Sequence, residues 1–80
     1  MFKIIPIPAF YDNYIWLIVN DQNQAIVIDP GDATPVLKYL TENDLTLSHI
    51  LITHHHADHT GGIGKLTKQT NAIVYAPKIS

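Results

Sequence analysis

A cluster of histidines followed by glycines at residues 53–62 is the most informative stretch of the sequence. It contains four of the chain's five histidines and an aspartate. Zn²⁺ readily accepts imidazole nitrogen and carboxylate oxygen, and the chain has no cysteine to supply a thiolate. An interior run of three histidines followed by Asp-His and two glycines fits neither a tag nor a low-complexity tract. The stretch therefore predicts a metal site with nitrogen and oxygen ligands only.

The neighbouring segments place this cluster on a loop between a strand and a helix. Residues 49–53 are apolar and partly β-branched, which predicts a buried strand that ends at His54. Glycines follow the cluster, and Ile63 and Leu66 then occur at helical spacing, which predicts the first turns of a helix. The cluster is thus expected on the loop between this strand and this helix.

Side-chain alternation divides the cluster into two groups of ligands. If the backbone leaves the strand still extended, His54 and His56 face one way and His55 faces the other. Asp58 and His59 come where the chain turns, so they are able to hold a second ion nearby. Two metal ions roughly 3.5–4 Å apart are a recurring hydrolytic device, because they share a bridging water. The predicted ligands are His54, His56, Asp58 and His59.

The N-terminal part of the sequence predicts three strands. Residues 3–7 are expected at a sheet edge, because Pro6 cannot donate to a neighbouring strand. Residues 13–20 and 24–29 are rich in β-branched and aromatic residues and are separated by a polar turn, which predicts an antiparallel hairpin. Asp29 ends this hairpin, and the sequence by itself favours a turn role for it.

The rest of the chain predicts alternating helices and strands. Thr34 is expected to cap a helix of roughly ten residues that has Pro35 at its first position and ends near Asn43. His49 is expected to be a partly exposed structural residue, and residues 71–75 a final strand. The order of strands and helices is typical of the α/β class.

Composition limits the classes of protein to which the chain belongs. Eighty residues make at most one small domain, and 46% hydrophobic with 15% charged residues indicates a globular chain. With a net charge of −2, no arginine and scattered lysines, nothing indicates a nucleic-acid surface, and Lys65 and Lys68 are assigned to a solvated helix face. No apolar run is long enough to span a membrane, and no signal peptide is recognised, so a cytoplasmic protein is expected.

The pattern His54-x-His56-x-Asp58-His59 resembles the signature of the metallo-β-lactamase superfamily. The flanking sequence motifs are similar to the N-terminal part of the glyoxalase II family, the hydroxyacylglutathione hydrolases. The resemblance implies that residues 1–80 are the N-terminal portion of a metallo-β-lactamase-like domain, truncated, and form the N-terminal half of a four-layered αββα sandwich. The flanking sequence motifs are Ile7-Pro8-Ala9-Phe10, Asp12-Asn13-Tyr14-Ile15-Trp16, Asp29-Pro30-Gly31-Asp32 and Thr53-His54-His55-His56.

The same resemblance implies a reaction. In the family, two zinc ions, with iron or manganese as alternatives, provide a metal-bound hydroxide. This hydroxide attacks the thioester of an S-(2-hydroxyacyl)glutathione such as S-lactoylglutathione, and glutathione and a hydroxy acid are released in methylglyoxal detoxification. No side-chain nucleophile is required. The resemblance also implies that Asp29 lies under the metal centre and orients it, as metal-bound histidines require.

The resemblance also implies parts that these 80 residues do not contain. The family takes a further histidine for each ion, a bridging aspartate and the glutathione-binding residues from later in the chain, whereas no histidine follows His59 here. The 80 residues alone are therefore expected to be inactive. Three alternatives stay open: an iron-dependent persulfide dioxygenase of the same fold, a nuclease of the same fold, and an inactive metal-binding fragment.

Overall fold

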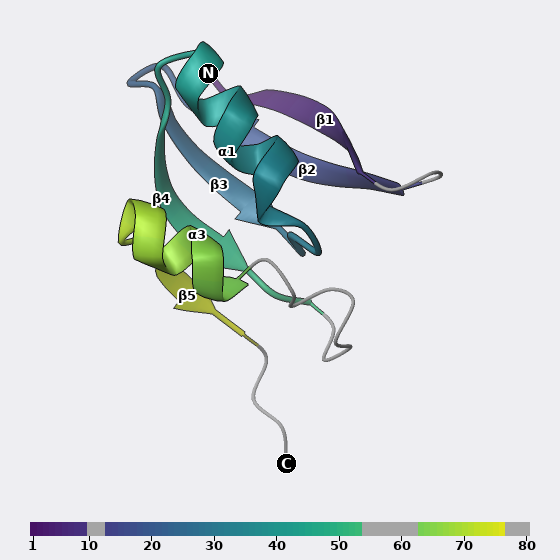
Figure 1. Cartoon of the computed structure of the whole chain (residues 1–80). Coiled ribbons are helices and arrows are strands. Elements are labelled where there is room, and N and C mark those ends of the chain that lie inside the picture. Colours follow the sequence, from purple (N-terminus) through teal and green to yellow (C-terminus); the bar gives the residue numbers. More distant parts are fainter. Residues whose placement is uncertain (10–12, 54–62, 77–80) are drawn as a thin grey trace.

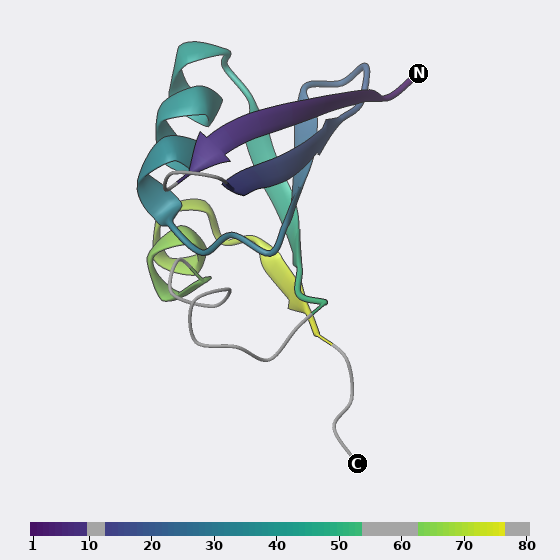
Figure 2. The same cartoon turned by 90° about the vertical axis from the view of Figure 1, so that its right-hand side faces the viewer.

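The structure is a computed structural model that describes residues 1–9, 13–53 and 63–76. They form one five-stranded sheet with two helices against one of its faces (Figures 1 and 2). The strands are β1 (Lys3–Ala9), β2 (Asn13–Val19), β3 (Gln24–Ile28), β4 (Thr46–Leu51) and β5 (Ile73–Tyr75), and the helices are α1 (Ala33–Glu42) and α3 (Ile63–Thr70).

The sheet has the strand order β1-β2-β3-β4-β5. The pairs β1/β2 and β2/β3 are antiparallel, and the pairs β3/β4 and β4/β5 are parallel. Because a parallel pair requires a crossover, α1 connects β3 to β4 and α3 lies between β4 and β5 in the chain. The α/β class and the antiparallel hairpin are therefore confirmed.

Strand β1 forms one edge of the sheet, as Pro6 predicted, although it is longer than the five residues expected. Pro6 and Pro8 lie opposite Trp16 and Tyr14 of β2. Residues two apart in a strand direct their backbone nitrogens the same way. Since proline has no N–H to donate to β2, both proline nitrogens are expected to face the free edge of the sheet. This free edge therefore has few donors with which to bind a further strand.

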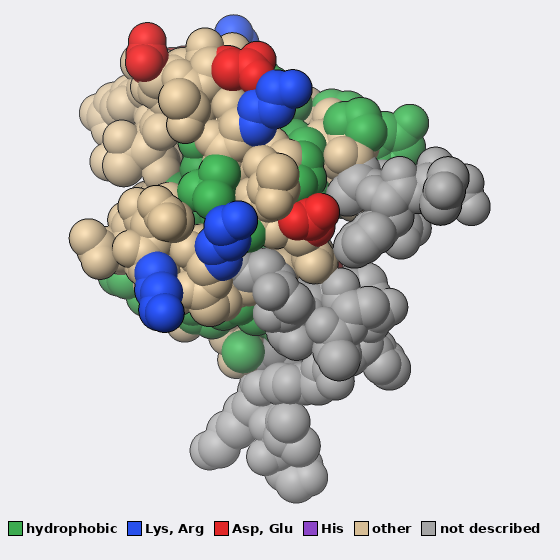
Figure 3. Space-filling model, in the orientation of Figure 1, with side chains coloured by type: hydrophobic (Ala, Val, Ile, Leu, Met, Phe, Trp, Pro, Cys, Tyr) green, Lys and Arg blue, Asp and Glu red, His purple; other side chains and the backbone are tan. Residues whose placement is uncertain are grey.

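The hydrophobic core lies between the sheet and the two helices. Alternate residues of β2 and β3 face the helices, so Leu17 and Val27 are fully buried there. They belong to the same core cluster as Val36 of α1 and Leu66 of α3. Figure 3 views the molecule from this helix side, where lysine and acidic side chains are spread over the described surface without a stripe of one sign. Both helices are thus amphipathic covers for one side of the sheet.

Strand β4 begins at Thr46 and ends at Leu51, so the prediction of a strand over residues 49–53 was displaced. The pairing shifts register between Ala25 and Ile26 of β3, which leaves Ser48 as an extra residue in β4. Leu47 and Ile50 are both buried as a result, although they are three residues apart. The prediction depended on the apolar run over residues 49–53, which does not reveal that the bulged strand starts earlier, at Thr46.

Helix α1 starts before the predicted position. Asp32, and not Thr34, is the N-cap: its backbone is extended, and its Oδ1 accepts a hydrogen bond from the Thr34 N–H at 3.0 Å. Pro35 is the third helical residue, where a missing N–H costs nothing because the first-turn donors have no partner within the helix. The predicted end near Asn43 is confirmed, since Asn43 is the C-cap.

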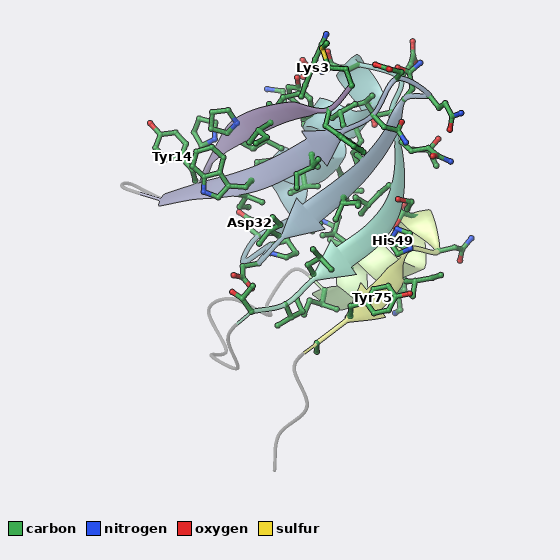
Figure 4. The ribbon with its side chains drawn as sticks, turned by 180° about the vertical axis from the view of Figure 1, so that it is seen from behind. Lys3, Tyr14, Asp32, His49 and Tyr75 are labelled. Carbon is green, nitrogen blue, oxygen red and sulfur yellow. The ribbon has the colours of Figure 1, made fainter. Side chains whose placement is uncertain are left out.

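The other face of the sheet carries large apolar side chains that the described residues leave exposed (Figure 4). Trp16 lies opposite Pro6 on β1 and Ile28 on β3, so apolar residues continue from strand to strand. Among the described residues, no helix is long and apolar enough to cross a membrane. The exposed side chains include Ile4, Tyr14, Trp16, Ile73 and Tyr75.

Candidate metal centre

The predicted metal loop begins where two neighbouring parallel strands end. Asp29 directly follows β3, and Thr53 comes two residues after the end of β4. Because parallel strands run in the same direction, their carboxyl ends meet at one edge of the sheet, and loops there can bring side chains together. In the sequence, residues 54–62 come between this edge and α3, and Figure 1 shows where β3, β4 and α3 lie. The predicted histidine cluster therefore begins, in the sequence, at the residue after Thr53, which lies at this edge with Asp29.

The backbone of Asp29 is held in an unusual conformation. Its φ angle is +49°, in the left-handed region that aspartate and asparagine enter more readily than other non-glycine residues. The Asp29 N–H donates to the Leu51 carbonyl at 2.9 Å, which extends the β3/β4 pairing by one residue. Pro30 follows and is fully buried. These features fix the position from which the carboxylate of Asp29 projects.

The carboxylate of Asp29 binds Thr53 through both of its oxygens. Oδ1 accepts a hydrogen bond from the Thr53 backbone N–H at 2.7 Å, and Oδ2 accepts one from the Thr53 hydroxyl. Hydrogen bonds to an ionised carboxylate are roughly twice as strong as neutral ones. Asp29 thus holds the residue that directly precedes the first predicted ligand, a contact between positions 24 apart in the sequence.

The predicted ligands lie outside the described residues. His54, His56, Asp58 and His59 belong to the segment that the structure leaves out, as does His55, so their assignment stays a prediction. Within residues 1–9, 13–53 and 63–76, no group of three or more histidine, aspartate or glutamate side chains gathers to hold a metal ion.

The described surroundings fit such a site. Its donors are all nitrogen and oxygen, and the strand that leads to them ends in a hydrogen-bonded clamp between Asp29 and Thr53. Metal-binding histidines generally need supporting groups of this kind to fix their direction. The sequence by itself favoured a turn role for Asp29, and the family resemblance implied the supporting role. The contact with Thr53 was missed, because nothing in the sequence pairs the two positions.

The fifth histidine, His49, lies in the middle of β4 and is half-buried. Its ring stacks on Tyr75 of β5 with 5.5 Å between ring centroids, and Figure 4 shows the two side chains together on the face away from the helices. Its Nδ1 lies 2.9 Å from the Ser48 hydroxyl, which itself donates to the Ala25 carbonyl at 3.1 Å. Since that hydroxyl proton is already used, Nδ1–H donates to Ser48. The contacts agree with the structural role expected for His49.

Comparison with known proteins gives the same family at the level of sequence. Residues 9–79 match the Metallo-beta-lactamase superfamily. The hydroxyacylglutathione hydrolase of Hahella chejuensis is 61% identical over 75 residues, which are 94% of this chain and 29% of that protein. The hydroxyacylglutathione hydrolase of Photobacterium profundum is 63% identical over 68 residues, which are 85% of this chain and 27% of that protein. The resemblance to glyoxalase II found in the sequence is thereby confirmed.

Solved structures give the same family at the level of the fold. The crystal structure of the BLEG-1 B3 metallo-beta-lactamase superposes with a TM-score of 0.77 at 34% identity, over 94% of this chain and 36% of that one. ETHE1 from Myxococcus xanthus superposes with a TM-score of 0.69 at 36% identity, over 92% of this chain and 34% of that one. These matches confirm the predicted fold class.

The matches cover most of this chain but only a small part of each relative. The chain spans less than a third of the length of the curated relatives it matches, at 29% and 27% for the two named above. In contrast, the family match extends over residues 9–79, which is nearly the whole of this chain. The chain therefore belongs to the metallo-β-lactamase superfamily.

Proposed function

We propose that the whole protein carrying these 80 residues is a metal-dependent hydroxyacylglutathione hydrolase. The observation that carries this proposal is the identity of 53–63% to relatives of that name. The clamp between Asp29 and Thr53 beside the predicted metal loop supports it. The chain would then be the N-terminal portion of a longer metallo-β-lactamase domain, and later segments would supply the remaining ligands and the groups that recognise glutathione.

Four residues of this chain would hold the metal. His54 and His56 would bind one ion, and Asp58 and His59 a second, with zinc as the proposed metal and iron or manganese as alternatives. When bound, such a pair supplies Lewis acidity, which polarises a carbonyl oxygen and makes a water molecule nucleophilic at neutral pH. His55 would contribute no ligand, because alternation directs it the other way.

The proposed reaction is hydrolysis of a glutathione thioester such as S-lactoylglutathione. Water adds to the carbonyl carbon, the carbon–sulfur bond breaks, and the sulfur leaves with the electron pair of that bond. The products are glutathione and a hydroxy acid, in the cytoplasm and as part of methylglyoxal detoxification. The described residues would contribute by positioning: the Asp29 carboxylate holds Thr53, and Thr53 precedes the first ligand.

The test is thioester hydrolysis by the whole protein, followed through the ultraviolet absorbance of S-lactoylglutathione. We expect a chelator to abolish turnover and zinc to restore it. His56→Ala and Asp58→Ala should reduce turnover by orders of magnitude at matched metal content, because each removes a ligand. His55→Ala is the control and should do much less harm.

Three results would contradict this proposal. Near-normal hydrolysis by His56→Ala or Asp58→Ala would show that the ligands are wrongly assigned. Oxygen consumption with a persulfide substrate, coupled to a single iron and without thioester hydrolysis, would instead identify a persulfide dioxygenase. A whole protein that holds metal without any turnover would support the inactive alternative.

A further inference from the structure

Thr53 joins a fixed point of the sheet to the predicted metal loop. Its N–H donates to Asp29 Oδ1 at 2.7 Å, and its hydroxyl donates to Asp29 Oδ2. The two bonds restrain different parts of the residue, because the first fixes the backbone and the second fixes the side-chain rotamer. Thr53 therefore has little freedom to rotate, and the next residue is His54.

The segment before Thr53 is held from both sides. On one side, the Asp29 N–H donates to the Leu51 carbonyl at 2.9 Å. On the other, the N–H of Ile52 donates to the Tyr75 carbonyl of β5 at 2.8 Å, and the Ile52 side chain is buried. Three successive residues, 51 to 53, are thus bonded alternately to the β3 and β5 sides. The direction in which the chain leaves the sheet is fixed by these bonds, and the clamp on Thr53 is the last of them before His54.

A simpler reading is that Thr53 only completes a strand, as β-branched residues often do. Its side chain is exposed, however, and makes no contribution to the buried core. Exposed substitutions generally change folding stability little, and the loss of one exposed hydrogen bond adds only a modest cost. The structure therefore separates the two readings: loss of the hydroxyl should affect the loop beyond Thr53 much more than it affects the fold.

We propose that Thr53 is a positioning residue, which uses its hydroxyl to pass the fixed orientation of Asp29 to the metal ligands that begin at His54. This inference rests on the proposed metal centre, and deepens it by naming a residue outside the predicted ligand set. The hydroxyl is the essential group. Valine has the shape of threonine without the hydroxyl, whereas serine keeps the hydroxyl and loses only a methyl group.

The test compares three variants of the whole protein: Thr53→Val, Thr53→Ser and the control Thr46→Val. Thr46 is exposed at the opposite end of the same strand, so its substitution makes the same chemical change far from the loop. Zinc affinity is measured by competition with a chromophoric chelator, which requires no turnover. We expect Thr53→Val to bind zinc about 10–100-fold more weakly, as for other groups that support metal ligands. Thr53→Ser should stay within about threefold of the unmodified protein, and Thr46→Val should not change.

Two further measurements separate positioning from folding. Thermal unfolding of the metal-free proteins should show only the small loss of one exposed hydrogen bond for Thr53→Val relative to Thr46→Val. At partial zinc saturation, kcat of Thr53→Val for S-lactoylglutathione should fall while KM changes little, and excess zinc should restore much of the loss. Asp29→Asn is the second variant, because asparagine tolerates the left-handed backbone but has one acceptor oxygen in place of two. It should weaken zinc binding in the same direction.

The inference is overturned if Thr53→Val binds zinc as tightly as Thr46→Val, or if Thr53→Ser loses zinc as readily as Thr53→Val. It is also overturned if Thr53→Val fails to fold while Asp29→Asn folds and binds zinc normally. The proposed activity fails separately, through a protein that binds zinc but does not hydrolyse the thioester. In that event the zinc affinities of the variants still test the role of Thr53.

Discussion

Replacement of Leu66 by alanine should loosen helix α3, which follows the predicted metal loop. Leu66 is 0% exposed and is the one buried residue among the eight of this helix. Removing three buried carbon atoms costs about 2.4 kcal/mol in transfer free energy, and the cavity left behind raises the total to about 3 kcal/mol. A helix of eight residues has little stability of its own, so its attachment depends on this side chain.

The assay is amide hydrogen exchange, resolved by residue. A local loss of about 3 kcal/mol should increase exchange in α3 by about a hundredfold, while β2 and β3 change much less. Lys65→Ala is the matched control, because Lys65 lies on the same helix with its side chain exposed. If exchange in α3 rises by less than about threefold, or if every strand accelerates equally with α3, the reasoning that Leu66 is the main anchor of this helix is refuted.

Three smaller predictions follow from other contacts. Asp32→Ala should lower the free energy of unfolding by about 1 kcal/mol through loss of the cap on α1, whereas Asp32→Asn should keep most of it; thermal melts distinguish the two, and equal melting would exclude the cap. Lys38→Ala should lower the free energy of unfolding by less than about 0.5 kcal/mol, because its ion pair with Glu42 spans 3.9 Å at the surface. A larger decrease in denaturant melts would show that this ion pair contributes more to stability than expected. Removal of metal from the whole protein should leave the exchange of β2 amides nearly unchanged, since the core lies between sheet and helices; general acceleration would mean that the metal holds the fold together.

The sequence predicted the strands and helices well where one face of each is buried. Strand β2 alternates Ile15, Leu17 and Val19 toward the helices, and α1 places Val36 and Leu40 on one side, so the periodicity was visible. The edge position of β1 followed from Pro6, because proline lacks a donor. These features depend on residues close together in the chain, which is why a single sequence is sufficient to predict them.

The errors arose where one local signal competed with another. Thr34 and Asp32 are both good capping residues, and the structure uses Asp32, since its side chain accepts from the N–H two residues on. In β4, the apolar run over residues 49–53 set the predicted start, whereas the strand begins at Thr46 and contains a bulge at Ser48 that removes the period of two. Neither choice can be decided without knowing the backbone geometry.

Part of the candidate site was predictable from the sequence, and part required the folded structure. The histidine cluster was evident from residue types and spacing, and the family resemblance assigned Asp29 to its support. The contact of Asp29 with Thr53 joins two strands across 24 positions and depends on their parallel pairing, so only the folded sheet brings it into view.

The most direct test of the metal centre is an anomalous-difference map from crystals of the whole protein grown with zinc and measured across the zinc absorption edge. We predict two peaks beside the Asp29–Thr53 clamp, about 2.0–2.2 Å from nitrogen or oxygen atoms of the four predicted ligands, with His55 unbound. The four are His54, His56, Asp58 and His59. Zinc peaks elsewhere, or these four side chains pointing away from the zinc, would contradict the account.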